Sequence, residues 1–200
     1  MLGGDPRRIR LVYSLLFSLP GTPVLLYGEE IGMGENLDID ERDAVRVPMQ
    51  WRPDGGFSTA AASAHPLPSP EGPYGPQHVN VEAQLMAPDS LFAFVRGLAR
   101  SYRQSPEIGW GDLELVPATA PSVLAHGART SESRFIAVHN FAGEPVAFEI
   151  DLGEEPDGTE LVCLASGESW ALKGATVSME LDGYGARRLR VTRPGDGRLR

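Results

Sequence analysis

The chain has 200 residues, of which 42% are hydrophobic and 22% charged, and this composition excludes a wholly disordered protein. Glycine and proline together number 40 (23 glycines and 17 prolines), which predicts many loops and tight turns rather than a helical bundle. A formal net charge of −9 argues against a nucleic-acid partner, and a single cysteine excludes an internal disulfide and a cysteine-based zinc site.

The first thirty residues predict a helix, a turn and a buried strand. Asp5 and Pro6 mark the helix start, because an aspartate caps free amide groups and a proline loses no hydrogen bond at the first helical position. Apolar residues follow at three- and four-residue spacing until Pro20 and Gly21 end the helix. The run Val24–Tyr27 is apolar without alternation, which is typical of a parallel strand covered on both faces.

The apolar run Leu11–Leu19 lies behind three arginines and therefore has the outline of a signal peptide. Interrupting prolines and the lack of a small-residue cleavage site argue against that interpretation. No segment reaches the roughly 18 apolar residues that a membrane span needs. We therefore expect a cytoplasmic protein with no membrane partner.

Residues 32–77 predict a long loop, rich in glycine and proline, and a loop of this length is either functional or disordered. Its first half is charged and holds Arg42, Arg46 and Trp51. The second half, around Ala60–Pro70, consists of small residues and proline and is expected to be flexible.

A second helical segment is predicted from about Val81 to Tyr102, with a restart at Pro88 and an end at Ser105-Pro106. Beyond it, short β-type runs alternate with turn residues at the 8–12-residue spacing of a sandwich or barrel. These runs are 113–116, 123–126, 135–139, 146–150, 160–164, 177–181 and 187–191. We accordingly predict a first domain at 1–105, a β-sandwich at 106–193 and a tail at 194–200.

Few residues stand out as candidates for chemistry. Glu29 and Glu30 follow the predicted strand, where barrel enzymes place active-site groups, but adjacent strand residues point to opposite sides and do not form one catalytic pair. A capping role and a salt bridge to a barrel arginine stay open for them. Arg46 can present its planar donors to two sugar hydroxyls or to a carboxylate, and Trp51 either stacks on a sugar or lies in the core.

Several site types are absent from the sequence. The four histidines, at 65, 78, 126 and 139, show no metal-ligand spacing, and we expect no metal and no cofactor. No nucleophile-elbow, phosphate-loop or dinucleotide-binding motif is present. Cys163, in an apolar run, is predicted to lie in the core.

Two segments resemble the alpha-amylase superfamily (glycoside hydrolase family 13). Gly21–Met33 is similar to its eighth-strand motif, which reads Gly-x-Pro, an apolar strand and Tyr-Gly-x-Glu. Arg46–Trp51 resembles the Arg-x-Pro-Met-Gln-Trp segment of the oligo-1,6-glucosidase and trehalose synthase (maltose α-glucosyltransferase) branch. Further blocks of similarity are Met1–Arg10, which resembles a segment after the seventh strand, Gly56–Ser58, His78–Gln84 and the hairpin Leu181–Ala186.

The resemblance implies an α+β chain: the last βα portion of a TIM (β/α)8 barrel, then a C-terminal antiparallel β-sandwich. It implies the C-terminal part of a retaining enzyme that transfers α-glucosyl groups of maltose, trehalose or short α-glucans, with α-glucosidase action also open. The three carboxylates of that chemistry belong to strands four, five and seven, and no acidic residue here matches them. We expect no catalytic residue in this chain and no activity of the chain alone; the alternative is a stand-alone, non-catalytic sugar-binding or interaction module.

The resemblance also assigns substrate binding. Arg46 matches the arginine that binds hydroxyls of the glucose in the pocket, Arg42 is a second candidate, and Glu30 matches the acidic residue near the pocket floor. The implied partner is a neutral sugar. Because the strand Val24–Tyr27 has no neighbours of its own sheet here, its edge is expected to be exposed and to self-associate.

Overall fold

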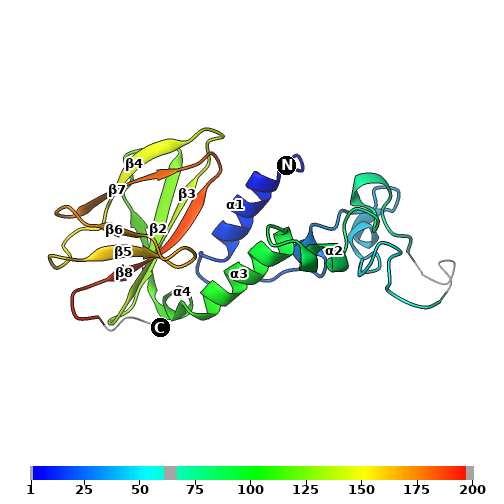
Figure 1. Cartoon of the computed structure of the whole chain (residues 1–200), viewed down its shortest axis with the longest axis horizontal. Coiled ribbons are helices and arrows are strands. Elements are labelled where there is room, and N and C mark those ends of the chain that lie inside the picture. Colours follow the sequence, from blue (N-terminus) through cyan, green and yellow to red (C-terminus); the bar gives the residue numbers. More distant parts are fainter. Residues whose placement is uncertain (1, 61–66, 197–200) are drawn as a thin grey trace. The chain divides into compact units, whose positions relative to one another are not determined.

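A computed structural model describes residues 2–60 and 67–196 of the chain (Figure 1). Its contacts divide the chain into two compact units, one of Met1–Pro23 with Leu98–Arg200 and one of Val24–Gly97. This grouping cuts the chain at other places than the predicted domains 1–105, 106–193 and 194–200, which stay a prediction. Residues 61–66 of the segment expected to be flexible, and 197–200 of the tail, lie outside the described residues.

The helices begin where the sequence places capping residues. Helix α1 (Pro6–Leu16) starts as predicted, with the Asp5 carboxylate accepting from the Arg7 backbone N–H at 2.8 Å. The second helical segment is two helices, α2 (Val81–Met86) and α3 (Leu91–Arg103), because the chain restarts after Pro88. Helix α3 ends at Arg103, close to the predicted end at Ser105-Pro106. The short helix α4 (Pro106–Trp110) was not expected: Pro106 also occupies the first turn of this new helix.

The C-terminal part contains two antiparallel sheets (Figure 1). A six-stranded sheet has the order β1-β2-β3-β8-β5-β6, and β4 and β7 form a second sheet of two strands. All seven predicted runs are strands, whereas β6, only three residues long, was missed. The strands are β1 (Asp112–Val116), β2 (Val123–Arg129), β3 (Arg134–Asn140), β4 (Val146–Asp151), β5 (Glu160–Cys163), β6 (Ser169–Ala171), β7 (Thr176–Leu181) and β8 (Ala186–Thr192).

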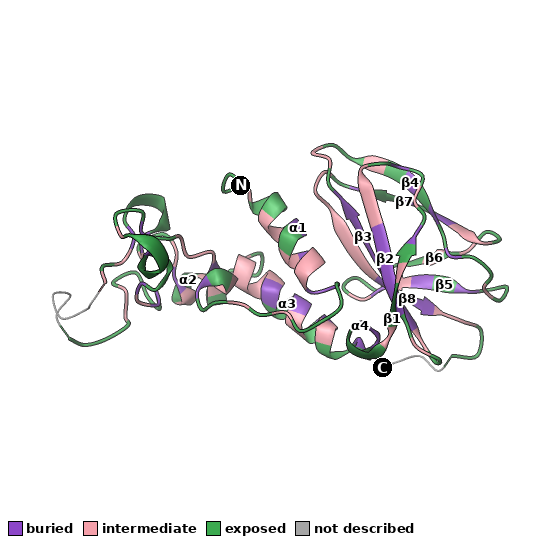
Figure 2. Ribbon diagram, turned by 180° about the vertical axis from the view of Figure 1, so that it is seen from behind, coloured by how far each residue is buried: buried purple, intermediate pink, exposed green. Residues whose placement is uncertain are grey.

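The six-stranded sheet is covered on both faces, and all seven residues of β3 are buried. One face, with Ile136 and Val138, packs in a core that includes Phe148 of β4. The other face, with Phe135, packs against Ile108 of α4. Figure 2 shows the buried residues gathered on these strands. Cys163 is 5% exposed within the first core, so its predicted place is confirmed.

The hairpin between β7 and β8 holds helix α1. The Arg8 guanidinium donates to the Tyr184 hydroxyl at 2.7 Å, and the Arg7 and Arg8 guanidinium carbons lie 5.3 and 4.9 Å from the tyrosine ring centroid. Tyr184 has a positive φ of 59°, and a Cβ at Gly183 would lie 1.9 Å from the Gly143 carbonyl oxygen. The turn therefore needs glycine at 183 to present Tyr184 to the helix.

The run Val24–Tyr27 is a correction to the sequence analysis. No strand forms there, and Val24 is 81% exposed, whereas a strand covered on both faces was predicted. A parallel strand exists only when neighbouring strands pair with its backbone, and none of the described strands does so. The apolar pattern thus predicted the residue types of a buried strand, whereas the resemblance had already led us to expect no neighbouring strands for it in this chain.

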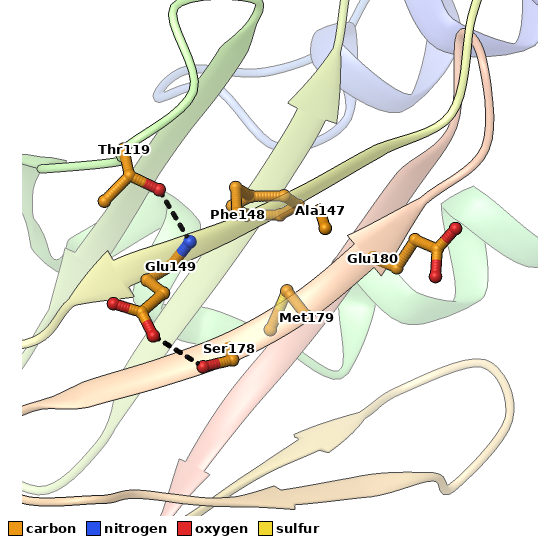
Figure 3. A pocket seen from close by; sticks show the side chains of 7 residues that line it. All are labelled: Thr119, Ala147, Phe148, Glu149, Ser178, Met179 and Glu180. Atoms are coloured by element: carbon orange, nitrogen blue, oxygen red, sulfur yellow. Dashed lines mark hydrogen bonds between the residues drawn. The ribbon is translucent and has the colours of Figure 1, made fainter.

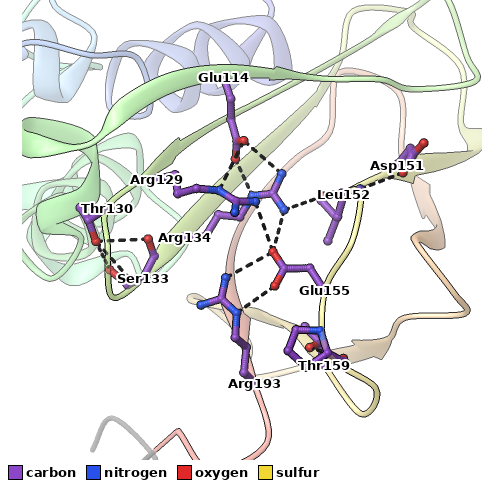
Figure 4. Close-up of polar contacts among 12 residues, drawn as sticks. Glu114, Arg129, Thr130, Ser133, Arg134, Asp151, Leu152, Glu155, Thr159 and Arg193 are labelled. Atoms are coloured by element: carbon purple, nitrogen blue, oxygen red, sulfur yellow. Dashed lines mark hydrogen bonds and ion pairs between the residues drawn. The ribbon is translucent and has the colours of Figure 1, made fainter.

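A buried ion-pair network closes one end of the sandwich (Figure 4). Glu155 accepts from Arg193 Nε at 2.8 Å and from Arg134 Nη1 at 2.9 Å, and Arg134 also donates to Glu114. The Arg134 side chain is 4% exposed and the Glu155 side chain 2%. Burial acts to raise the pKa of Glu155, but hydrogen bonds from Arg193 and Arg134 outweigh it and hold that pKa below its usual value.

We predict that Glu155→Gln destabilises the compact unit that contains the sandwich by about 3 kcal/mol. The substitution removes the carboxylate that the buried Arg134 shares with Arg193, and of its two carboxylate partners Arg134 keeps only Glu114. Urea unfolding followed by circular dichroism measures this loss. Because the Glu155 pKa is lowered on folding, its contribution is present above the unfolded-state value and is lost as pH falls through the folded value. Glu154→Gln, at the exposed neighbour, is the control and should change stability by less than about 0.5 kcal/mol; equal stability of the two variants would contradict the assignment.

Candidate functional site

The acidic pair lies in a tight turn of the unit Val24–Gly97. Glu29 and Glu30 begin a short 3-10 helix, η1 (Glu29–Ile31), between Gly28 and Gly32, which have φ values of 89° and 73°. Glu29 accepts from the Leu26 N–H at 3.0 Å, and Glu30 accepts from the Gly28 N–H at 2.8 Å. Both carboxylates therefore cap local backbone, which is one of the two roles that the sequence left open.

The predicted arginines lie on a second 3-10 helix, η2 (Glu41–Val45), and just after it. Arg46 Nη1 is 3.5 Å from Asp43 Oδ1, and both side chains are more than half exposed, so this ion pair adds little stability. Arg42 is also exposed. Within residues 2–60 and 67–196, no hydrogen bond or ion pair joins Glu30, Arg42 and Arg46. The three predicted substrate-binding residues thus occupy neighbouring segments without mutual contact.

Gln50 supports the segment that carries Arg46. Its side chain is fully buried, and Nε2 donates to the carbonyl oxygens of Tyr74 at 3.1 Å and Val79 at 2.6 Å. The backbone carbonyl of Gln50 accepts a hydrogen bond from the Val81 N–H at 3.0 Å. The loop returning through η4 (Gly72–Tyr74) is therefore tied to the segment 46–51.

The acidic turn is joined to the same framework. The Tyr27 hydroxyl donates to the Val47 carbonyl at 2.9 Å. Gln84 Nε2 donates to the Ile31 carbonyl at 2.6 Å, and its Oε1 accepts from the Phe92 N–H at 3.0 Å. Sequence reasoning quoted Gln84 only as part of a similar block, since nothing local indicates a partner 53 residues away. Trp51 is 48% exposed, so it is not a core residue of this unit.

A groove of about 590 Å³ lies on the outer face of β4 and β7 (Figure 3). Its lining residues are Thr119, Ala147, Phe148, Glu149, Ser178, Met179 and Glu180. Glu149 accepts from the Ser178 hydroxyl at 2.8 Å, and its N–H donates to Thr119 Oγ1 at 2.9 Å. Phe148, the aromatic residue of the lining, is 3% exposed, so the groove offers hydroxyl and carboxylate groups but no ring on which a sugar could stack.

Two further site types are absent from the part of the chain that the structure describes. No group of three or more histidine, cysteine, aspartate or glutamate residues is placed to hold a metal ion. Among these residues, no helix is both long and apolar enough to cross a membrane.

Comparison with known proteins finds two matching families, one in each half of the chain. Residues 2–111 match the alpha amylase catalytic domain family, and residues 133–190 match the sucrose hydrolase-like C-terminal domain family. The trehalose synthase of Pimelobacter sp. (strain R48) is 38% identical over 202 residues, covering 97% of this chain and 35% of the relative. The trehalose synthase/amylase TreS of Mycobacterium tuberculosis (strain CDC 1551 / Oshkosh) is 41% identical over 158 residues, covering 76% and 26%.

A solved structure agrees in fold. The trehalulose synthase MutB from Pseudomonas mesoacidophila MX-45 superposes with a TM-score of 0.71 at 21% identity, covering 96% of this chain and 40% of that one. The chain thus spans between about a quarter and two fifths of the length of these three proteins. The barrel-end and β-domain architecture predicted from the sequence is confirmed by the first family match and by the antiparallel sheets that follow it.

We predict that Gln50→Met loosens the loop that returns to the Arg46 segment, because the Tyr74 and Val79 carbonyls lose their shared donor at a cost of about 1–3 kcal/mol. Hydrogen exchange at the Val81 and Glu82 amides, which donate to residues 50 and 51, measures the change. Gln77→Met, at an exposed glutamine of the same loop, is the matched control. Equal exchange in the two variants would remove Gln50 from this role.

Proposed function

The chain belongs to the alpha-amylase family, and we propose that it is the C-terminal part of a retaining enzyme that transfers α-glucosyl groups of maltose, trehalose or short α-glucans. The observation that carries the proposal is the match to trehalose synthase over 97% of the chain. Both curated relatives compared above are named for trehalose synthesis. Since the chain spans only 35% of the first of them, the activity belongs to the whole enzyme.

The chemistry of the family requires carboxylates that this chain does not supply. A retaining glycosidase uses one carboxylate as nucleophile and a second as acid and base. Glu29 and Glu30, the acidic residues nearest the motif, each accept a hydrogen bond from local backbone instead. The proposal therefore includes that the chain alone is inactive and contributes binding groups rather than reacting ones.

Arg46 is the residue proposed to bind the sugar. Among the described residues its guanidinium forms one long ion pair, 3.5 Å to an exposed aspartate, so most of its donors are available to hydroxyl groups of a substrate. The buried Gln50 fixes the backbone four residues further on. Arg42, exposed on η2, is proposed as a second donor, and Glu30 as the residue that shapes the floor by holding the turn at Gly28.

A chimera tests this assignment directly. The first two thirds of the Pimelobacter trehalose synthase, followed by this chain, is expected to interconvert maltose and trehalose, whereas the chain alone forms neither trehalose nor glucose from maltose. In the chimera, Arg46→Ala should lower kcat/KM by about 10²-fold, the loss of a charged hydrogen bond to substrate.

Arg52→Ala is the matched control, because Arg52 is an exposed arginine paired with Asp54 at 3.4 Å, and it should leave kcat/KM unchanged. Turnover of maltose by the chain alone would contradict the absence of catalytic groups. Equal kcat/KM in the two chimera variants would contradict the role of Arg46. Saturable NMR shifts at Arg46 on titrating the chain with maltose, in a protein whose chimera is folded but inactive, would favour the sugar-binding module instead.

Self-association is the further part of the proposal, supported by the exposed apolar side chains of the segment 24–27. Val24 is 81% exposed and Leu26 42%. We expect sedimentation velocity to detect oligomers of the chain, and the double variant Val24→Ser/Leu26→Ser to shift them toward monomer, because it removes apolar surface. A wild-type chain that sediments as a monomer at micromolar concentration would refute this expectation.

A further inference from the structure

Two histidines are stacked beneath helix α1. His126 of β2 and His139 of β3 are 1% and 0% exposed, and their rings lie 5.5 Å apart between centroids with planes at 6°. His126 Nε2 donates to the Ser18 carbonyl at 3.2 Å, and His139 Nε2 lies 3.2 Å from the Ser14 hydroxyl. Both rings therefore bind the last turn of the helix or the residues just after it.

No acid compensates a positive charge at this place. The other ring nitrogens, Nδ1 of both histidines, are buried without a hydrogen-bond partner. Among the described residues, no carboxylate forms a hydrogen bond or ion pair with either ring. The charged group acting on His139 from β8 is Arg188, a cation that is itself largely buried.

Other charged or titratable groups on α1, α3 and α4 have partners of their own. Glu107 of α4 pairs with Arg190 of β8 at 3.3 Å, Arg8 of α1 binds Tyr184, and the Tyr102 hydroxyl of α3 donates to the Gly21 carbonyl. Arg10 and Tyr13 of α1 have interactions of their own. A protonated ring would therefore be buried away from water, near the cation Arg188 and without a counter-ion.

We propose that the His126–His139 pair makes the contact between helix α1 and the six-stranded sheet acid-labile. While the helix is docked, both rings stay neutral, because burial disfavours the charged form. When the helix leaves the sheet, the rings meet water and regain an ordinary affinity for protons. Acid therefore favours the detached helix, independently of any sugar chemistry of the protein.

The direction of the effect follows from the pKa values. Burial, together with the charges of His126 and Arg188, lowers the pKa of His139 to about 3, and burial lowers the pKa of His126. A histidine whose pKa is depressed in the docked state stabilises docking above the ordinary value of 6.5 and loses that contribution as pH falls toward the depressed value. For one ring, detachment becomes about tenfold more favourable per pH unit well below 6.5. Because half of the exposed rings are already protonated at pH 6.5, the change between pH 6.5 and 5.0 is about sixteenfold.

Hydrogen exchange of the full chain tests the proposal. After correction for intrinsic rates, the opening constant of the amides in Leu11–Leu16 should rise about sixteenfold between pH 6.5 and 5.0. The amides of β3 should stay protected, which separates release of the helix from global unfolding. The range avoids the Glu155 network, because the pKa of Glu155 lies below its usual value of 4.5.

His139→Gln and His126→Gln, measured separately, should each weaken this pH dependence, since glutamine does not titrate. His78→Gln, at an exposed histidine of the other unit, should leave it unchanged. Wild-type exchange that does not depend on pH, or a dependence that survives in both variants, would overturn the proposal. Should both variants fail to fold, NMR of the wild-type ring protons decides: His126 and His139 must titrate below the ordinary histidine value of 6.5, and titration near 6.5 in the docked state would overturn the proposal.

Discussion

The stability of the compact unit Met1–Pro23 with Leu98–Arg200 depends on covering strand β3 on both faces. All seven of its residues are buried, so one face needs the sheet of β4 and β7 and the other needs helices. Apolar side chains of β3 alternate between these two cores, with Ile136 and Val138 on one side and Phe135 on the other. Helices α1 and α4 are therefore part of the same folding unit as the sandwich, although most of the chain between them lies in the other unit.

Local pattern predicted the elements whose stability is local or whose partners are near in sequence. The seven strand runs were recognisable because each is a short β-type run and turn residues separate them at a spacing of 8–12 residues. β6 has three residues, too few to show a period, and α4 was missed because Pro106 both ends one helix and begins the next. The strand predicted at 24–27 failed for a different reason: apolarity indicates that a segment is to be covered, but pairing requires strands that the described chain does not contain.

The residues proposed to bind substrate were predicted from the family resemblance, whereas the side-chain contacts that hold their segments in place were not predicted. Arg46 and Glu30 belong to motifs that are read directly from the sequence. Gln50 and Gln84 hold these motifs together through side-chain hydrogen bonds across 24 to 53 residues, and no local signal reports such contacts. His126 and His139 lie in two of the predicted strand runs, and these runs are strands. Their contacts with Ser18 and with Ser14 of α1 join positions more than 100 residues apart.

The hydrogen bond between Arg8 and Tyr184 limits where the C-terminal part can be separated from the rest of the chain. The match to the alpha amylase catalytic domain family ends at residue 111, directly after α4. Separating the chain at residue 111 would remove α1 from Tyr184 and expose His126, His139 and Phe135 to water. A C-terminal part separated or recombined at residue 111 therefore keeps these groups covered only if Asp5–Ser18 accompanies it, so this structural unit is discontinuous in the sequence.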